Sequence, residues 1–133
     1  MAKILVVDDE KSIRALYSEA LTNEGYEVVT SGSCQETLRL IASFEPSGVV
    51  LDIRMDDCDG LDLLQEIRLS YPDLAIILNT AYDSFREDVK SIAADDYVVK
   101  SYDLSELKAS LASILKNNQP EEGKQARSMS RHV

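Results

Sequence analysis

The chain has 133 residues, of which 44% are hydrophobic and 29% are charged, and its net charge is −10. This length and balance are typical of one globular domain and exclude a wholly disordered chain. The negative charge opposes binding to nucleic acid, because such binding depends on basic side chains that neutralise phosphates. No apolar run approaches the roughly 18 residues of a membrane span, and the amino terminus lacks the apolar core of a signal peptide. We therefore expect a cytoplasmic domain that binds neither nucleic acid nor membranes.

The end of the chain differs in composition from the rest. Residues 117–133 carry three basic and two acidic side chains, so the negative charge lies before them. They include Pro120 and Gly123 and have almost no periodic apolar positions. This composition is typical of a flexible end or of a linker to a further domain. We predict a folded domain over residues 1–118 and a flexible tail or linker over residues 119–133.

Five short apolar runs recur along the first 116 residues. Most of them are continuous rather than alternating, which is typical of parallel strands that are buried on both faces. The second run is more mixed, as expected for a strand at the edge of a sheet. The predicted strands are residues 4–7, 26–30, 49–51, 74–78 and 97–99.

Between these runs the apolar residues recur at the helical period of 3.6. Gly25 stands where a glycine commonly ends a helix, and Pro46 and Pro72 stop the second and third helices. The apolar faces of the predicted helices lie within residues 13–21, 38–42, 61–71, 85–93 and 104–115. Capping-box spacings open the second, fourth and fifth helices, at Ser33 and Glu36, Ser84 and Glu87, and Asp103 and Glu106.

This alternation predicts an α/β fold of the flavodoxin-like (βα)5 type. Its doubly wound parallel sheet would have the strand order 2-1-3-4-5, with helices on both faces because the crossovers are right-handed. Ligands of such sheets bind beyond the carboxyl ends of the strands, near the switch point between strands 1 and 3. The functional residues are therefore expected at that edge.

Polar residues follow four of the five strands at their carboxyl ends. Asp8 and Asp9 follow the first strand, Asp52 the third, Thr80 the fourth and Lys100 the fifth. Carboxylates placed so close together require a cation or a raised pKa, and oxygen ligands of this charge suit Mg²⁺. A carboxylate can attack phosphorus, and the transition state needs cations around the phosphoryl oxygens. The pattern therefore predicts phosphoryl transfer to Asp52, assisted by Thr80, Lys100 and Mg²⁺.

The same residues resemble a known family over residues 3–116. The runs KILVVDDE and DDYVVK, the strand VVLDIRM with Gly60 eight residues after its aspartate, and Thr80 before Ala81 are similar to response regulator receiver domains of two-component signalling. The resemblance implies a phosphorelay domain rather than an enzyme. It would take its phosphoryl group from a phosphohistidine of a sensor histidine kinase or a histidine phosphotransfer protein, and signal to a downstream output domain or protein.

The resemblance also implies a role for each site residue. Asp52 would accept the phosphoryl group, and Thr80 and Lys100 would contact it. Tyr97, with Thr80, would switch the surface formed by the fourth helix, the fifth strand and the fifth helix. Arg54 and Tyr82 would tune the lifetime of the acyl phosphate. The ligands of Mg²⁺ (or Mn²⁺) would be Asp9 and Asp52 directly, Asp8 through water, and the backbone carbonyl of Arg54.

The sequence departs from the family pattern at several positions. Asp56 stands where receivers usually have proline, and Ser101 replaces the proline after Lys100. A cis bond before a non-proline residue costs about 2.5–4 kcal/mol, so we predict a trans or strained Lys100–Ser101 bond with a displaced loop. The pair Ala93-Ala94 replaces the usual Gly-Ala, and the segment before Lys100 is slightly short. The fourth predicted helix is therefore expected to be shortened or poorly ordered.

Two other functions remain open on the sequence. One is an interaction module that keeps the fold but works without phosphorylation, which the altered lysine–serine junction suggests. The other is a Mg²⁺-dependent phosphatase that forms an aspartyl phosphate. Against the phosphatase, no second carboxylate follows Asp52 at a spacing of two residues, and no cap domain is present to hold a substrate.

Several of these residues also have purely structural interpretations. Asp8, Asp9 and Glu10 could cap the following helix and complement its dipole. Tyr97 could be a half-buried strand aromatic that does not switch. These interpretations weaken only if the other site residues converge on the same pocket.

The acidic loop and the two cysteines are predicted to be structurally simple. Asp56, Asp57 and Asp59 could form a second cation site, but a solvated acidic loop is favoured. Cys34 and Cys58 lie on loops after the two strands that flank strand 1, which predicts no disulfide between them.

Overall fold

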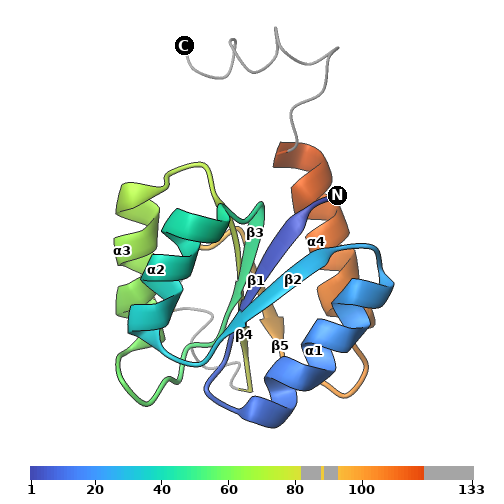
Figure 1. Cartoon of the computed structure of the whole chain (residues 1–133), viewed down its shortest axis with the longest axis horizontal. Coiled ribbons are helices and arrows are strands. Elements are labelled where there is room, and N and C mark those ends of the chain that lie inside the picture. Colours follow the sequence, from blue (N-terminus) through green and yellow to red (C-terminus); the bar gives the residue numbers. More distant parts are fainter. Residues whose placement is uncertain (82–87, 89–92, 119–133) are drawn as a thin grey trace, which may run out of the picture.

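The computed structural model describes residues 1–81, 88 and 93–118, which form a parallel sheet with helices on both faces (Figure 1). The strand order is β2-β1-β3-β4-β5, as the alternation of elements predicted. The strands are β1 (Lys3–Val7), β2 (Glu27–Ser31), β3 (Gly48–Leu51), β4 (Ala75–Thr80) and β5 (Asp96–Val99). The helices are α1 (Lys11–Asn23), α2 (Cys34–Phe44), α3 (Gly60–Ser70) and α4 (Ser105–Asn118).

The fourth predicted helix, over residues 85–93, lies almost wholly outside the described residues, as do its expected cap residues Ser84 and Glu87. The fifth predicted helix corresponds to α4. The Asp103 carboxylate stands before that helix and accepts a hydrogen bond of 2.9 Å from the Ser105 backbone N–H. No helix in the described part of the chain is long and apolar enough to cross a bilayer.

Two hydrophobic cores lie on the two faces of the sheet. Successive side chains of a strand point to opposite faces, so Leu5 and Val7 join the core beneath α2 and α3. Ile4 and Val6 join the other core, beneath α1 and α4. Figure 1 shows the two pairs of helices on either side of the sheet. Every residue of β3 and β4 is buried, whereas most of β2 is partly exposed, which confirms β2 as an edge strand.

Local signals set the ends of the first two helices. Gly25 has a φ of +97°, a conformation that costs glycine little, and it lets the chain turn from α1 into β2. The Ser33 hydroxyl accepts a hydrogen bond of 3.1 Å from the Glu36 backbone N–H, which confirms the predicted cap of α2. The described residues contain no cis peptide bond, so the Lys100–Ser101 bond is trans, as its missing proline predicted.

Candidate functional site

Three carboxylates converge beyond the carboxyl ends of β1 and β3. Val7 and Leu51 are register partners in these neighbouring parallel strands, so the residues that follow them leave the sheet side by side. Asp8, Asp9 and Asp52 offer carboxylate oxygens that all lie within 4.8 Å of one another. Asp8 and Asp52 are only 2% and 5% exposed. The predicted convergence of the acidic residues is therefore confirmed.

Lys100 reaches this cluster from the end of β5. Its Nζ lies 2.7 Å from an oxygen of Asp8 and 3.2 Å from an oxygen of Asp52. The Lys100 backbone N–H donates a hydrogen bond of 2.7 Å to the Thr80 carbonyl, which aligns the strand ends. One lysine offsets one negative charge, so the three carboxylates keep a net negative charge that suits a divalent cation.

The electrostatics of the site follow from burial. Burial raises the pKa of Asp52, Lys100 lowers it and Asp8 raises it, with a net value of about 6. Burial lowers the pKa of Lys100, but its hydrogen bond to Asp8 and the charge of Asp52 outweigh burial, so the net shift is upward. The pKa of Asp9 is raised by burial and by the neighbouring carboxylates of Asp56 and Asp8. Each added carboxylate makes the cluster harder to ionise without a cation.

Thr80 ends β4, next to the strand that carries Asp52. It is fully buried, and among the side chains that the structure describes its Oγ1 is the buried polar atom without a hydrogen-bond partner. A buried hydroxyl without a partner is costly, and such groups in a native protein call for an explanation. A ligand oxygen bound at the strand ends would supply one.

The loop from β3 to α3 folds back on itself beside the cluster. The Gly60 backbone N–H donates a hydrogen bond of 2.8 Å to the Ile53 carbonyl, and Arg54 and Asp59 form a β-bridge. A Cβ at Gly60 would collide with the backbone of Asp52 and Ile53, so only glycine fits there. This closed neck fixes the backbone of Arg54, which is two residues after Asp52 in the sequence.

The loop aspartates Asp56, Asp57 and Asp59 are all exposed, as predicted. Two of them also form hydrogen bonds that the sequence did not predict. The Asp57 carboxylate accepts hydrogen bonds of 3.0 Å from the Cys34 backbone N–H and of 3.5 Å from that of Gln35, so it stabilises the amino end of α2. The Asp59 carboxylate caps α3 by accepting from the Leu61 backbone N–H at 2.9 Å.

The prediction for the cysteines is wrong. Cys34 and Cys58 form a disulfide, with their Cα atoms 6.2 Å apart. The sequence predicts that the two cysteines lie on loops after strands 2 and 3, on either side of strand 1. In the structure α2 and α3 cover the same face of the sheet, and the loop after β3 bends over that face until Cys58 packs against the core that contains Cys34.

The helix-cap interpretation of the acidic pair receives little support. Glu10 is the N-cap residue of α1, but no side-chain hydrogen bond caps the helix there. One Asp8 oxygen accepts from the Glu10 backbone N–H at 2.9 Å, while the other oxygen lies against Lys100. Asp8 therefore orders the start of the loop and still faces the cluster.

Two tyrosines have predicted roles, Tyr97 in the switch and Tyr82 in tuning the acyl phosphate lifetime, and the structure describes only Tyr97. Tyr97 is 7% exposed and belongs to the core beneath α2 and α3, so it is more buried than the half-buried strand aromatic considered above. Tyr82 lies outside the described residues. The switching role of Tyr97 and the lifetime role of Tyr82 stay predictions.

Sequence reasoning missed a buried hydrogen-bond relay behind the cluster. The Tyr17 hydroxyl donates to Asn79 Oδ1 at 2.7 Å, and Asn79 Nδ2 donates to the Val98 carbonyl at 2.9 Å. Burial raises the pKa of Tyr17, so its hydroxyl stays protonated as a donor. A tyrosine at a core position of a helix is the signal that could have revealed this relay, since a buried tyrosine usually needs a partner.

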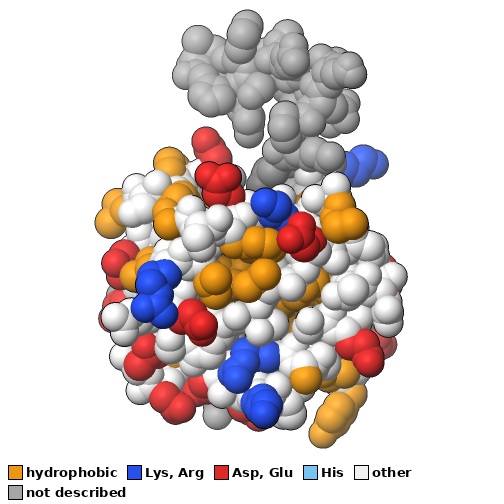
Figure 2. Space-filling model, in the orientation of Figure 1, with side chains coloured by type: hydrophobic (Ala, Val, Ile, Leu, Met, Phe, Trp, Pro, Cys, Tyr) orange, Lys and Arg blue, Asp and Glu red, His pale blue; other side chains and the backbone are white. Residues whose placement is uncertain are grey.

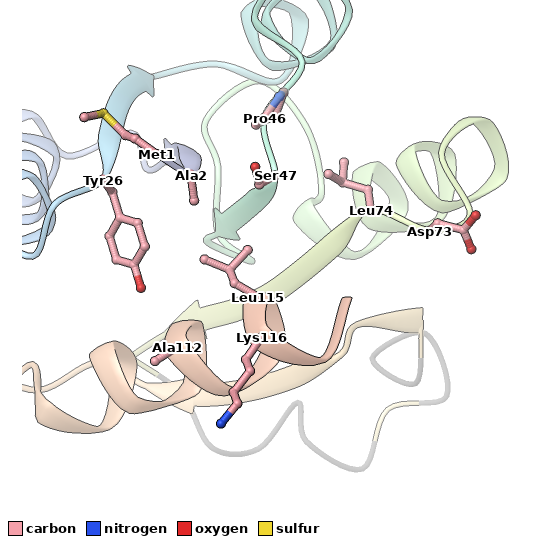
Figure 3. Close-up of a pocket in the computed structure, with 10 residues that line it drawn as sticks. All are labelled: Met1, Ala2, Tyr26, Pro46, Ser47, Asp73, Leu74, Ala112, Leu115 and Lys116. Carbon is pink, nitrogen blue, oxygen red and sulfur yellow. The ribbon is translucent and has the colours of Figure 1, made fainter. Parts of the chain in front are cut away.

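A hollow of about 670 Å³ lies at the opposite end of the sheet, where the strands begin (Figure 3). It contains none of the predicted site residues. On the face shown in Figure 2, acidic and basic side chains alternate around exposed hydrophobic ones, and no single-sign patch dominates. The hollow therefore lacks the residues on which the predicted chemistry depends.

The carboxyl edge of this doubly wound parallel sheet holds three carboxylates, a lysine and a buried hydroxyl, a set of groups that suits phosphoryl transfer. The sequence matches the response regulator receiver domain family over residues 4–112, so the chain belongs to that family. It is thus a phospho-accepting signalling domain of the two-component type.

Relatives and solved structures agree with this assignment. The chain is 39% identical over 123 residues to the response regulator MprA of Mycolicibacterium vanbaalenii. The aligned residues make up 91% of this chain and 53% of the relative. The chain thus spans about half the length of the curated relatives it matches.

Similar folds have been solved with ligand and partner. The response regulator TrrA of Thermotoga maritima, in complex with Mg²⁺ and BeF, has a TM-score of 0.84 and 46% identity, over 86% of this chain and 99% of that one. TrrA in complex with the histidine kinase ThkA matches with a TM-score of 0.82, at the same identity and coverage.

Proposed function

We propose that this chain is the receiver of a two-component phosphorelay and that Asp52 accepts the phosphoryl group. The donor would be a phosphohistidine of a sensor histidine kinase or of a histidine phosphotransfer protein. The observation that carries the proposal is the contact of the Lys100 ammonium with both Asp8 and Asp52, which assembles residues from three strand ends into one site. The solved complex of TrrA with ThkA supports a kinase as the partner.

In this proposal the chain's own residues perform the transfer. An oxygen of Asp52 attacks phosphorus in line with the departing imidazole nitrogen, so that an O–P bond forms while the N–P bond breaks. The Lys100 ammonium and the Thr80 hydroxyl hold the equatorial oxygens. The orphaned Thr80 Oγ1 fits this task, because a phosphoryl oxygen would supply the partner that it lacks.

The cluster also fits the metal that the family uses. Asp8, Asp9, Asp52 and the Arg54 carbonyl would hold Mg²⁺ (or Mn²⁺), since hard cations prefer oxygen ligands of high negative charge. When bound, the cation neutralises the carboxylates and the charge that develops on the transferred group. The complex of TrrA with Mg²⁺ and BeF supports this choice.

The output of the proposed switch would be a change at the surface that contains β5 and α4. Phosphorylation adds charge beside Lys100 and Thr80, which would bias the position of Thr80 and of Tyr97. Residues 85–93 would complete this surface, and Arg54 and Tyr82 would tune the acyl phosphate lifetime. A downstream domain or protein would recognise the changed surface.

The remaining features of the proposal concern the whole protein. Residues 1–118 would form the receiver, and residues 119–133 would form a tail or the start of a linker. The acidic surface argues against direct contact with nucleic acid, and we propose a cytoplasmic protein that reaches its target through a protein or an attached output domain.

Incubation with acetyl phosphate and Mg²⁺, followed by intact mass measurement, tests the proposal. The wild-type chain should gain one phosphoryl group, and Asp52→Asn should gain none. Asp73→Asn is the matched control, because Asp73 is exposed at the far end of the sheet and should leave labelling unchanged. No adduct on the wild type, under conditions that label a control receiver, would overturn the proposal in favour of an interaction module. Multiple turnover on a small phosphate ester that requires Asp52 would indicate a phosphatase.

A further inference from the structure

We propose that Cys34 and Cys58 form a redox-controlled tether that sets how readily Asp52 is phosphorylated. In the oxidised state the disulfide holds the loop between β3 and α3, and in the reduced state that loop is freer to leave its place. This inference rests on the proposed function, because it concerns the rate of phosphoryl transfer to Asp52.

The disulfide joins two segments that the backbone does not otherwise connect directly. Cys34 is the first residue of α2 and is buried, whereas Cys58 lies in the loop after β3 and is partly exposed. The two residues are 24 positions apart. The bond therefore fixes the tip of the loop to a helix that packs on the sheet.

The tethered loop begins at the proposed acceptor. Cys58 follows Asp52 by six residues, and the Arg54 carbonyl lies between them. The neck of the loop is closed by the Gly60–Ile53 hydrogen bond, so a constraint at Cys58 acts on a short segment. Asp56, near the tip, is an electrostatic neighbour of Asp9, which belongs to the carboxylate cluster.

A second contact brings the cysteines near each other when the bond is open. The Cys34 backbone N–H donates to both oxygens of the Asp57 carboxylate, each at 3.0 Å. This contact involves no sulfur, so reduction does not break it directly, and each return of the loop to α2 brings the two thiols together again. The pair is thus suited to reversible chemistry rather than to a single oxidation during folding.

The redox step balances with a low-molecular-weight disulfide such as glutathione disulfide as oxidant. The Cys58 thiolate, which is the more exposed, attacks one glutathione sulfur and releases a glutathione thiolate. The Cys34 thiolate then attacks the Cys58 sulfur of the mixed disulfide and releases the second glutathione. Two protein thiols lose two protons and two electrons, and one glutathione disulfide becomes two thiols.

The tether should favour phosphorylation because it restricts the loop to the position in which the Arg54 carbonyl and Asp52 face the same site. Misplacing reacting groups is expensive for a transfer that depends on positioning. We expect oxidised protein to be phosphorylated by acetyl phosphate roughly threefold to tenfold faster than reduced protein. Backbone amides of residues 53–59 should exchange with deuterium more slowly in the oxidised state.

The experiment equilibrates wild-type protein with oxidised or reduced glutathione, blocks free thiols with an alkylating agent and reads the intact mass. Two alkyl groups are expected on reduced protein and none on oxidised protein. Labelling rates and deuterium exchange are measured on the same samples before alkylation. The double variant Cys34→Ser/Cys58→Ser is the control, and its rate and exchange should match reduced wild type under both conditions.

Three outcomes would overturn the tether. They are equal labelling rates in the two redox states, equal exchange of the loop amides, or a pair that stays reduced at every glutathione ratio. The absence of any adduct on Asp52 in both states is a different result, because it removes the proposed function and leaves the thiol and exchange measurements to be read separately.

Discussion

The two ends of the sheet differ in what they bury. At the carboxyl ends, Asp8, Asp52 and Thr80 are almost completely enclosed, although burying charge and unpaired hydroxyls costs free energy. At the amino ends lies the roomier hollow, bordered by side chains such as Tyr26 and Leu115 (Figure 3). The hollow has space but none of the predicted site residues, which lie at the carboxyl edge. A site for a small phosphoryl group is therefore marked by costly polar burial rather than by volume.

The physical reason is that unfavourable burial needs a compensating gain. Lys100 supplies part of it for the two carboxylates, and a cation would supply more. The side chains at the amino edge need no such compensation. Four predictions can break or sharpen this comparison, beginning with the largest expected effect.

Removing the lysine should expose the cost of the buried carboxylates most directly. Lys100→Met leaves Asp8 and Asp52 without their counter-charge, so we expect the free energy of unfolding to fall by about 3 kcal/mol or more. Urea denaturation without added metal measures the effect. Lys116→Met, at the rim of the hollow, should change stability by no more than about 0.5 kcal/mol. Equal losses of stability for the two substitutions would contradict the difference between the two ends of the sheet.

Reducing the disulfide should lower stability by about 3 kcal/mol, because the bond restricts a long loop of the unfolded chain. Urea denaturation with and without a reductant checks this prediction. The Cys34→Ser/Cys58→Ser variant should unfold at the same urea concentration in both buffers. If the wild type unfolds at the same urea concentration with and without the reductant, the disulfide does not stabilise the protein.

Neutralising Asp52, the proposed acceptor, should stabilise the protein at neutral pH. The folded-state pKa of Asp52 is about 6, against an ordinary value of 3.8, so the native state binds the proton more tightly than the unfolded state does. Stability should therefore fall as pH rises from about 4 through 6 in metal-free buffer. Asp52→Asn removes this loss, and we expect a gain of about 2 kcal/mol at pH 7.

Chemical denaturation across this pH range is the measurement for Asp52. Asp73→Asn should keep the pH dependence of the wild type. Added Mg²⁺ should stabilise the wild type more than Asp52→Asn, because it binds the ionised carboxylate. A pH profile of Asp52→Asn that overlays the wild type would contradict the assigned pKa.

The smallest effect concerns the unpaired hydroxyl. Thr80→Val removes a buried group that has no partner in the described structure, so we expect a gain of about 1 kcal/mol in stability together with slower phosphorylation. Thr37→Val is the matched control, since its equally buried hydroxyl is bonded to Ser31 and to the Ser33 carbonyl. That control should lose about 1 kcal/mol. Thermal unfolding compares them, and a loss for both variants would mean that Thr80 has a partner after all.

The sequence by itself determined the order of the elements and the identity of the residues at the strand ends. The continuous apolar runs of buried strands and the 3.6-residue period of helices are local features of the chain, so they can be read from neighbouring residues. Once the strands are parallel, their carboxyl ends must share one edge. That geometry places Asp8, Asp52 and Lys100 at one edge, and the strand order and the length of the lysine side chain then bring them into contact.

Only the tertiary structure decided which side chains meet across the loops. The Cys34–Cys58 disulfide, the Asp57 carboxylate at the start of α2 and the hydrogen bond between Tyr17 and Asn79 join residues that are 23 to 62 positions apart. Such contacts depend on how far each loop bends over the sheet, and neither composition nor periodicity encodes that path. The isolation of the Thr80 hydroxyl is of the same kind, because a missing partner is a property of everything packed around an atom.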